Sequence, residues 1–462
     1  MTYKAYAVSW NLTQRCNLTC AHCYMSAAPG AGASGELSTD ECGRVMADIA
    51  RVNPHAVLIL TGGEPLLRKD IFQLAARGRD HGFTVVVGTN GVLLRDKQAR
   101  LLREHGVQGA SLSLDSTVPA KHDLFRHLPG AWQGAVRATE ALRAEGLDFS
   151  LHMSVTDWNV AEIPAMIDLA RELGARVLNL FFLVRTGRGE RLTDITPVQY
   201  EGILTYLARA QGVGNANEAE HPEPSVFTGR EDPWSVPMGR AGTMLIRAKC
   251  APHFRRIIYA LDPRSPLLAN YAHGSCPAGK YYCRITPEGD VTPCPYMPVS
   301  AGNLRRVGFA ELWERGQVFT DLREPRLGGR CGACEFQEIC GGCRCRAYAT
   351  YGDYLAEDPA CAYEPGRYGG EVLRLPADLT FGLEVRPTLS WEAGAQARLE
   401  AIPAFARGMV VQAVEAYVRS RSQAVVTPAL MAEVRSRWGI NPGQPFTPQT
   451  QRPSGKPIPP TG

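Results

Sequence analysis

Three cysteines near the start of the chain have a spacing that suits iron–sulfur chemistry. Cys16, Cys20 and Cys23 are separated by three and then two residues. From one loop they can bind three irons of a [4Fe–4S] cluster, which normally takes four cysteine ligands. The fourth iron is then open to bind and reduce a small molecule. A zinc site with His22 as fourth ligand, a redox pair or buried thiols are the alternatives, and the spacing suits them less well.

A second set of cysteines lies in the last third of the chain. Nine of the fourteen cysteines fall here: Cys276, Cys283, Cys294, Cys331, Cys334, Cys340, Cys343, Cys345 and Cys361. Two four-ligand sites need eight thiols, whereas a single zinc ribbon would leave five unused. In a chain without an export signal, such groups indicate metal ligands before disulfides.

Two further strand ends carry residues that could contact a ligand. The turn Gly62-Gly63-Glu64-Pro65 follows an apolar run, so its glycines allow close approach to the backbone and Glu64 offers an anion to an ammonium group. An ordinary tight turn is the alternative. The segment from Arg185 to Gly189 is basic, and either binds a substrate carboxylate through Arg185 or is a solvated loop.

The elements that position these residues follow from apolar periodicity. Strands are expected near 5–10, 57–60, 84–87, 110–114, 150–155 and 177–184, and helices near 38–52, 70–81, 97–105, 131–145, 161–173 and 197–211. Six strand–helix units in sequence predict an α/β fold with a parallel sheet, a partial (β/α)6 barrel. Such barrels carry their chemistry on loops at the carboxyl ends of the strands, where the first cysteines lie.

The stretch from Trp10 to Tyr24, with Cys-x3-Cys-x2-Cys followed by an aromatic residue, resembles the radical S-adenosylmethionine (SAM) superfamily. The resemblance implies that Cys16, Cys20 and Cys23 hold a [4Fe–4S] cluster that cleaves SAM. It further implies that the Gly62–Pro65 turn contacts the amino group of SAM. The SAM pocket would then include Tyr24, Gly62, Gly63, Glu64, Pro65, Asn90 and Ser113, with Arg185 beside it. Simple strand alternation is the other interpretation of Ser113.

The second cysteine set resembles the SPASM extension of radical SAM enzymes, which carries auxiliary [4Fe–4S] clusters. Transferred by position, the first auxiliary cluster would be held by Cys276, Cys283, Cys294 and Cys343, and the second by Cys331, Cys334, Cys340 and Cys361. The commonest SPASM spacing has x3 after the x5 gap, whereas Cys343 gives x2 and Cys345 gives x4. Cys343 is the favoured ligand, because Cys-Gly-Gly-Cys-Arg resembles the variant of tetrapyrrole-modifying members. Cys345 is then a spare thiol.

Within this superfamily the chain is most similar to enzymes that make heme by the siroheme route or the d-type heme of nitrite reductase. The motifs are Trp-Asn-Leu-Thr-x-Arg-Cys from Trp10, the Arg185–Gly189 loop and Cys-Arg-Ile-Thr-Pro-Glu-Gly-Asp-Val-Thr-Pro-Cys-Pro from Cys283. The resemblance implies an oxidoreductase that modifies a tetrapyrrole side chain, with auxiliary clusters as electron acceptors. A maturase of a peptide or protein is the main alternative. A non-catalytic electron carrier is the second, although a carrier gains nothing from an open iron.

The remaining segments divide the chain. We expect a barrel over 1–211, a connector over 212–275, the SPASM-like domain over 276–370, a three-helix domain over 376–438 and a disordered tail over 439–462. Cys250 and His253 in the connector, and Cys42, are more often structural than ligands. The segment from Trp391 to Tyr417, with Ile402, Phe405, Arg407 and Glu415, resembles the small C-terminal domain of the B subunit of light-independent protochlorophyllide reductase. A docking or dimerisation module is the alternative.

Composition limits the partners. Lys+Arg 50 against Asp+Glu 46 gives a formal charge of +4 without a basic run, so neither nucleic acid nor an anionic membrane is expected. The chain has no long apolar segment, and its N-terminus lacks the pattern of a signal peptide. We therefore expect a cytoplasmic enzyme without a membrane span, reduced by a low-potential donor such as ferredoxin or flavodoxin.

Overall fold

A ten-stranded sheet organises the first part of the chain in the computed structural model, which describes residues 3–32, 34–214, 244–263, 265–269, 276–375, 387–400 and 404–438. The chain divides into two compact units, residues 1–385 with 403–409, and residues 386–402 with 410–462. Each unit is described by itself. The expected tail, most of the connector and the pair Ile402-Pro403 lie outside the described residues.

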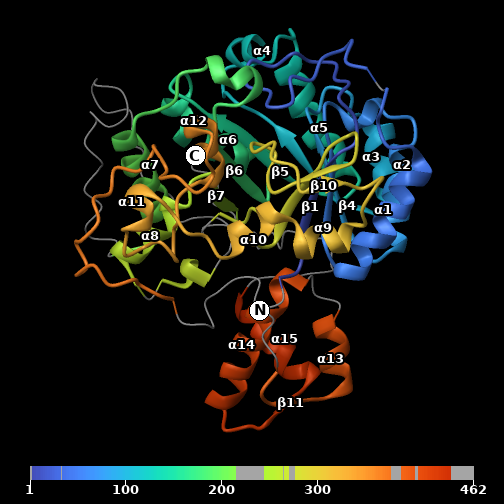
Figure 1. Cartoon of the computed structure of the whole chain (residues 1–462). Helices are drawn as coiled ribbons and strands as arrows, with labels where there is room; N and C mark the ends of the chain where they lie inside the picture. The colour runs from blue at the N-terminus through green and yellow to red at the C-terminus, as the bar shows by residue number, and fades with distance from the viewer. Residues whose placement is uncertain are drawn as a thin grey trace, which may run out of the picture. The chain divides into compact units, whose positions relative to one another are not determined.

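Eight strands of the sheet are parallel, in the order β8-β1-β2-β3-β4-β5-β6-β7 (Figure 1). Their bounds are β1 Ala7–Asn11, β2 Val57–Thr61, β3 Thr84–Thr89, β4 Val107–Ser113, β5 Asp148–Val155, β6 Val177–Phe182, β7 Leu245–Lys249 and β8 Tyr282–Ile285. The antiparallel strands β9, Asp290–Thr292, and β10, Gly302–Asn303, continue the sheet beyond β8. The predicted six-unit α/β barrel is thus confirmed, and two parallel strands from later in the chain extend it.

Helices connect the parallel strands. They are α1 Thr39–Val52, α2 Ile71–Asp80, α3 Asp96–Glu104, α4 Pro119–Arg126, α5 Ala131–Ala144, α6 Ile163–Leu173 and α7 Pro197–Ala210. Ser38 caps α1 through a capping box with Glu41, and Thr196 caps α7 in the same way with Gln199. The helix α4 was not predicted, although Pro119 occupies a first-turn position that favours helix initiation.

Strand alternation gives the sheet two different faces. On one face, apolar residues such as Trp10, Leu112, Leu151 and Leu178 are fully buried in the main hydrophobic core. Because successive side chains of a strand point to opposite sides, the residues between them point away from this core. We call that second side the inner face. It carries mostly polar side chains: Ser9, Asn11, Ser111, Ser113, Ser150, His152, Ser154, Asn179, Arg247, Lys249, Tyr282 and Arg284.

The cysteine-rich segment joins the same unit and the same core. It contributes β8 to β10 and the short helices α9 Phe309–Arg315, α10 Gln317–Arg323, α11 Gly329–Gly332 and α12 Arg344–Tyr351, preceded by α8 His253–Leu261. Trp313 and Phe319 are fully buried in the core that also holds Val8 and Trp10. Packing against the barrel thus fixes the position of the second cysteine set relative to the first.

The C-terminal unit contains α13 Ala393–Glu400, the part of α14 Ala404–Ser420 from residue 410 onward, and α15 Pro428–Trp438. Its two short strands, β11 Ser390–Trp391 and β12 Val425–Val426, pair in parallel. Glu415 is buried and accepts hydrogen bonds from the backbone N–H groups of Thr388 and Leu389 and from the indole of Trp391. One carboxylate thus ties the segment before α13 to α14.

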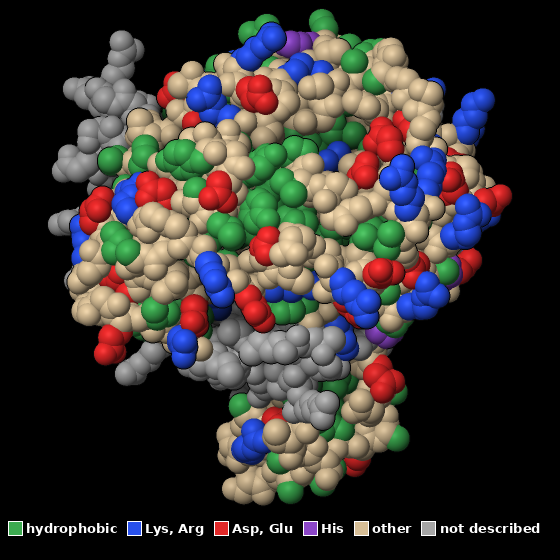
Figure 2. All heavy atoms as spheres, viewed as in Figure 1, with side chains coloured by type: hydrophobic (Ala, Val, Ile, Leu, Met, Phe, Trp, Pro, Cys, Tyr) green, Lys and Arg blue, Asp and Glu red, His purple; other side chains and the backbone are tan. Residues whose placement is uncertain are grey.

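Within the described parts of the chain, no helix has the length and apolar character needed to cross a bilayer. On the face shown in Figure 2, basic and acidic side chains are interspersed around a central area where hydrophobic side chains gather.

Candidate active site

The first three cysteines lie on the loop that follows β1. Cys16 and Cys20 are buried, with 6% and 7% of their surface exposed, and Cys23 is half-buried. The loop is closed by backbone hydrogen bonds from Cys16 N–H to the Ala28 carbonyl (3.2 Å) and from Cys23 N–H to the Cys20 carbonyl (3.3 Å). The Leu18 N–H points at Cys16 Sγ at 3.4 Å, as a donor to a thiolate would. The three thiols thus come from one short, folded loop.

A buried ion pair missed by the sequence analysis lies beside this loop. Arg126 at the end of α4 contacts Asp115 at 2.6 Å and points a guanidinium nitrogen at Cys20 Sγ at 3.7 Å. Burial raises the pKa of Cys20, and Arg126 opposes that rise. Burial also raises the pKa of Cys16 to about 12. Because ligation needs thiolates, metal binding must release protons here, and Arg126 favours the thiolate of Cys20.

The Gly62–Pro65 turn holds the cysteine loop by its backbone. Gly63 N–H donates to the Thr13 carbonyl at 2.7 Å, and Glu64 N–H donates to the Arg15 carbonyl at 2.8 Å. A Cβ on Gly63 would lie 2.1 Å from the Arg15 carbonyl oxygen, so only glycine fits. Pro65 then opens the 3-10 turn η1, Pro65–Leu67. Both glycines therefore have a packing role against the cysteine loop, in addition to any contact with a ligand.

The Glu64 carboxylate joins the ends of β2 and β3. It is fully buried and accepts hydrogen bonds from the Thr89 hydroxyl (2.8 Å) and from the Asn90 N–H (3.0 Å). Burial raises the pKa of Glu64 to about 7, against these hydrogen bonds. The Asn90 side chain donates to the Asn17 side chain at 2.8 Å, within the cysteine loop. Glu64 and Asn90 thus form one polar network beside Cys16.

Tyr24 and Ser113 both belong to the inner side of the sheet. The Tyr24 hydroxyl accepts a hydrogen bond from the Asn11 amide at 2.8 Å, and the Arg284 guanidinium lies over the ring at 5.6 Å. Arg284 also donates to the Asn11 side chain. The Tyr24 ring meets Tyr296 edge-on, with centroids 5.2 Å apart. Ser113 ends β4 and pairs in register with His152.

The two arginines of the loop after β6 have different contacts. Arg185 donates to the Glu190 carbonyl at 2.7 Å, within its own loop. Arg188 instead donates to the carbonyls of Cys20 (2.8 Å) and Ala27 (2.9 Å). Gly187 adopts a φ of +56°, where a Cβ would lie 2.6 Å from the Tyr24 carbonyl. The loop thus fastens the cysteine loop through Arg188, a residue that the sequence analysis did not single out.

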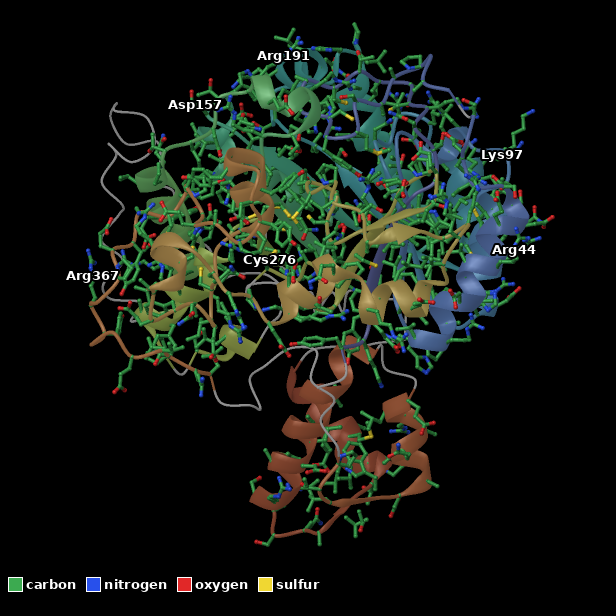
Figure 3. The ribbon with its side chains drawn as sticks, viewed as in Figure 1. Arg44, Lys97, Asp157, Arg191, Cys276 and Arg367 are labelled. Carbon is green, nitrogen blue, oxygen red and sulfur yellow. The ribbon has the colours of Figure 1, made fainter. Side chains whose placement is uncertain are left out.

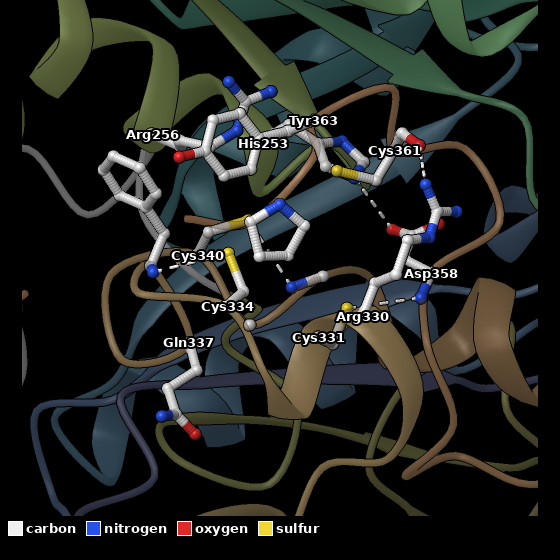
Figure 4. A pocket seen from close by; sticks show the side chains of 14 residues that line it. His253, Arg256, Arg330, Cys331, Cys334, Gln337, Cys340, Asp358, Cys361 and Tyr363 are labelled. Carbon is white, nitrogen blue, oxygen red and sulfur yellow. Dashed lines mark hydrogen bonds and ion pairs between the residues drawn. The ribbon is translucent and has the colours of Figure 1, made fainter. Parts of the chain in front are cut away.

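Four of the later cysteines line one cavity (Figure 4). Cys331, Cys334, Cys340 and Cys361 face it together with His253, Arg256, Arg330, Phe336, Gln337, Gly341, Gly342, Asp358, Tyr363 and Pro365. Backbone N–H groups point at three of the sulfurs: Asp358 N–H at Cys331 (3.4 Å), Phe336 N–H at Cys334 (3.4 Å) and Gly342 N–H at Cys340 (3.5 Å). Such donors stabilise thiolates bound to iron. We call these four thiols the second auxiliary group.

Another set of thiols, which includes Cys276 (labelled in Figure 3), is packed together around Cys345. The Cys345 thiol is hydrogen-bonded to the sulfurs of Cys276, Cys294 and Cys343, and these contacts with burial raise its pKa well above the usual range. The contact with Cys345 in turn lowers the pKa of Cys276 to about 6. We call Cys276, Cys294, Cys343 and Cys345 the first auxiliary group. Cys345, expected to be spare, is at its centre.

Cys250 lies near the first auxiliary group, whereas Cys283 lies in the hydrophobic core. Cys250 has a left-handed backbone with φ of +58°, and its thiol interacts electrostatically with those of Cys343, Cys294 and Cys276. Cys283 lies in β8 with its side chain in the hydrophobic core. Burial raises the pKa of its thiol, and the nearby Arg323 opposes that rise.

The physical reason is the alternation of β8. Burial and then the nearby Cys294 raise the pKa of Tyr282, which is one residue before Cys283, so Tyr282 lies on the side of the first auxiliary group. Cys283 must face the opposite side of the strand. The structure thus places Cys345, and not Cys283, beside Cys276, Cys294 and Cys343.

Asp358 lies between the two auxiliary groups. Its carboxylate accepts a hydrogen bond from Cys343 N–H at 2.6 Å, while its own N–H points at Cys331 Sγ. It is fully buried and forms ion pairs with Arg346 (3.1 Å) and His253 (3.2 Å). Arg346 also donates to the Tyr200 hydroxyl at 2.6 Å. One buried carboxylate therefore contacts a ligand residue of each group.

Two known families match the segments that carry most of these cysteines. Residues 10–170 match the family described as the radical SAM superfamily, and residues 276–344 match the iron-sulfur cluster-binding domain called SPASM. Residues 391–435 match the proto-chlorophyllide reductase 57 kD subunit.

Curated relatives cover most of the chain. An AdoMet-dependent heme synthase of Methanosarcina barkeri is 38% identical over 375 residues, which cover 79% of this chain and 99% of that protein. The pre-heme d1 synthase of Dinoroseobacter shibae is 33% identical, over 77% of this chain and 85% of that protein. The mycofactocin maturase MftC of Mycobacterium ulcerans is 29% identical, over 77% and 87%. AdoMet in these names is SAM.

A solved structure shares the fold. SuiB of Streptococcus suis bound to S-adenosylmethionine matches with a TM-score of 0.58 at 15% identity, over 78% of this chain and 78% of that chain.

Proposed function

This chain belongs to the radical SAM superfamily, in the group that contains the AdoMet-dependent heme synthases, and we propose that it oxidises a carboxylate side chain of a tetrapyrrole. It is a SAM-dependent enzyme that carries [4Fe–4S] clusters. When bound, SAM and the clusters supply an electron that splits SAM, a 5′-deoxyadenosyl radical that takes a hydrogen atom from substrate, and an acceptor for the surplus electron.

The contact between Tyr24 and Tyr296 carries this proposal. Tyr24 directly follows Cys23, and Tyr296 lies two residues after Cys294 of the first auxiliary group. The pKa of Tyr296 is raised by burial and then by the nearby Cys250, Tyr24 and Cys294. The radical-forming loop and an auxiliary group thus approach each other at the inner face. A substrate held there can lose a hydrogen atom on one side and an electron on the other.

The geometry of each group supports an assignment of ligands. In this proposal Cys16, Cys20 and Cys23 hold the SAM-cleaving cluster, and the first and second auxiliary groups hold one cluster each. SAM is bound by residues at or beyond the carboxyl ends of β1 to β4, namely Tyr24, Gly62, Gly63, Glu64, Pro65, Asn90 and Ser113. The cavity supports the assignment of one cluster to the second auxiliary group, because all four of its thiols line this one space. Backbone N–H groups also point at three of these sulfurs. A substrate contact of Arg185 stays a prediction.

The rest of the proposal concerns the surroundings of the enzyme. We place it in the cytoplasm, with a ferredoxin or flavodoxin as reductant. All fourteen cysteines are free, which supports a reducing compartment.

An anaerobic turnover assay tests the function. The reconstituted protein is given dithionite, SAM and a panel of porphyrins and chlorins, and 5′-deoxyadenosine and the substrate spectrum are followed. We expect 5′-deoxyadenosine to depend on a tetrapyrrole and the Soret band to shift. The Cys20→Ala variant should lose SAM cleavage while it keeps most auxiliary iron, because the three groups use separate thiols.

Two outcomes would contradict the tetrapyrrole assignment. SAM cleavage that is indifferent to every tetrapyrrole would favour a peptide substrate, in line with the similarity to the mycofactocin maturases. No cleavage at all, in protein with full iron content, would favour an electron carrier.

A further inference from the structure

Arg284 is a buried arginine on the inner face of the sheet. It lies in β8, where its backbone pairs with Ser9 of β1 and Thr292 of β9. Its neighbours in the strand, Cys283 and Ile285, are fully buried in the hydrophobic core. Arg284 therefore points to the opposite side, and only 8% of its surface is exposed.

Two neutral groups hold the Arg284 guanidinium. Its Nε donates a hydrogen bond to the side-chain oxygen of Asn11, and its Cζ lies over the Tyr24 ring, 5.6 Å from the centroid. The Asn11 amide donates in turn to the Tyr24 hydroxyl at 2.8 Å. These contacts fix the orientation of the guanidinium, but neither of them supplies a negative charge.

Three other buried arginines near the cysteines each pair with a carboxylate. These pairs are Arg126 with Asp115, Arg346 with Asp358, and Arg256 with Glu201. Arg284 forms no such ion pair with any residue that the structure describes, and its two terminal nitrogens donate to none of them. Neither nitrogen is fully enclosed by protein, so a ligand at the inner face can reach both. A buried charge without a counter-charge costs free energy, which a bound anion would recover.

The surroundings of Arg284 connect the two regions that carry the cysteines. Tyr24, which lies under the guanidinium, directly follows Cys23. The ring of Tyr24 meets that of Tyr296 edge-on at 5.2 Å, and Tyr296 lies two residues after Cys294 of the first auxiliary group. A ligand on Arg284 is therefore held where the SAM-cleaving loop and the first auxiliary group approach each other.

We propose that Arg284 binds a carboxylate of the substrate, on the side chain that reacts. This inference rests on the proposed function and deepens it. The two terminal nitrogens of a guanidinium match the two oxygens of a carboxylate, so Arg284 can form two parallel hydrogen bonds to it.

The methionyl carboxylate of SAM offers the same chemistry as a substrate carboxylate. Most of the proposed SAM residues lie at the ends of β2, β3 and β4, however, whereas Arg284 belongs to β8. The strand β1 separates β8 from those three strands in the sheet. This position favours the substrate as the source of the carboxylate.

Equilibrium binding tests this site separately from turnover. The full-length, cluster-loaded protein is titrated anaerobically with coproporphyrin and with its tetramethyl ester, and the change of the Soret band gives the dissociation constants. Arg284→Gln removes the charge and should weaken binding of the acid roughly 10- to 100-fold, the usual effect of losing charge-assisted hydrogen bonds. Arg284→Lys keeps the charge without the paired donors, so its loss should be smaller. Neither variant should weaken binding of the ester.

Asn11→Asp tests the charge while Arg284 itself stays in place. The substitution puts a carboxylate of the same size at the oxygen that accepts from Arg284 Nε. The new carboxylate pairs with the guanidinium, so binding of the acid should weaken and binding of the ester should not. As a control, Arg44→Gln removes the same charge from an exposed position on α1 and should leave both dissociation constants unchanged (Figure 3). Iron content and circular dichroism check the fold of each variant.

Two further measurements on Arg284→Gln identify other sources of the anion. Equilibrium dialysis measures SAM binding, and titrations followed by electron paramagnetic resonance measure the midpoint potentials of the clusters. Unchanged acid binding with weaker SAM binding would assign Arg284 to the carboxylate of SAM. Unchanged acid binding with a shifted midpoint potential would make Arg284 the counter-charge of a cluster. Either result would overturn the substrate site.

The outcomes also separate this proposal from the proposed function. Tight binding of the acid that neither Arg284→Gln nor Asn11→Asp weakens would overturn the Arg284 site and leave the tetrapyrrole function standing. A wild type that binds neither porphyrin, and whose SAM cleavage ignores both, would overturn the two proposals together.

Discussion

The two auxiliary groups differ in how their thiols are brought together. The second group takes three thiols from the single stretch Cys331–Cys340, and these surround a cavity with Cys361. The first group takes Cys276 and Cys294 from either side of β8 and β9, and Cys343 and Cys345 from the start of α12. A group built from one loop can be identified by spacing, whereas a group assembled by tertiary packing cannot.

The largest effect that we expect is loss of the first auxiliary cluster in a Cys345→Ser variant. This loss would distinguish the first auxiliary group from the second. Cys345 touches the three other sulfurs, so its replacement should remove about four irons per chain. The second auxiliary group should keep its iron. Iron and sulfide analysis with electron paramagnetic resonance measures both clusters, and Cys340→Ser provides the reciprocal case. Full iron content in Cys345→Ser would return Cys345 to the role of a spare thiol.

The contact between the groups gives the next prediction. Asp358→Asn removes the charge that compensates Arg346 and His253 in a fully buried site. Breaking a buried ion pair in this way costs about 3–5 kcal/mol. We expect the free energy of unfolding to fall by that amount in anaerobic denaturant titrations. Asp157→Asn, at an exposed position, should change it little (Figure 3). If the two variants had the same free energy of unfolding, the ion pairs of Asp358 with Arg346 and His253 would not contribute to stability.

His253, which lines the cavity of the second auxiliary group, should make stability depend on pH. Burial lowers the pKa of His253, but the Asp358 carboxylate and the Cys361 thiol raise it to about 9 overall. A histidine with a raised folded pKa contributes stability that is complete below its unfolded pKa and is lost as the pH rises through the folded value. The contribution is about 3 kcal/mol, lost between about pH 6.5 and pH 9.

Thermal unfolding across that range measures the effect. His253→Gln should flatten the decline, because its side chain does not titrate. A wild-type profile that is already flat would contradict the shifted pKa. Arg346, which pairs with the same carboxylate, stays protonated throughout this range and adds nothing to the profile.

Prediction from sequence succeeded where the pattern is local. The apolar runs placed β1 to β6 within a few residues, and Ser38 marked the start of α1, because periodicity and capping act over short distances. Arg126 and Arg188 were missed for the opposite reason. Each reaches the cysteine loop from an element distant in sequence, so local spacing does not reveal either contact. The first auxiliary group shows the same limit, since spacing alone does not tell which face of β8 carries Cys283.

Cys283 therefore offers the smallest expected effect and the most direct test of the comparison. Its thiol is fully buried in the core on the side of Arg323, away from the face that Tyr282 presents to Cys294. Cys283→Ala should leave the iron content unchanged and lower the free energy of unfolding by about 1 kcal/mol, the cost of a small cavity. Loss of about four irons would show that Cys283 binds the cluster, and that β8 rotates to bring its side chain to the first group when the cluster binds. The first group would then follow sequence spacing as the second does.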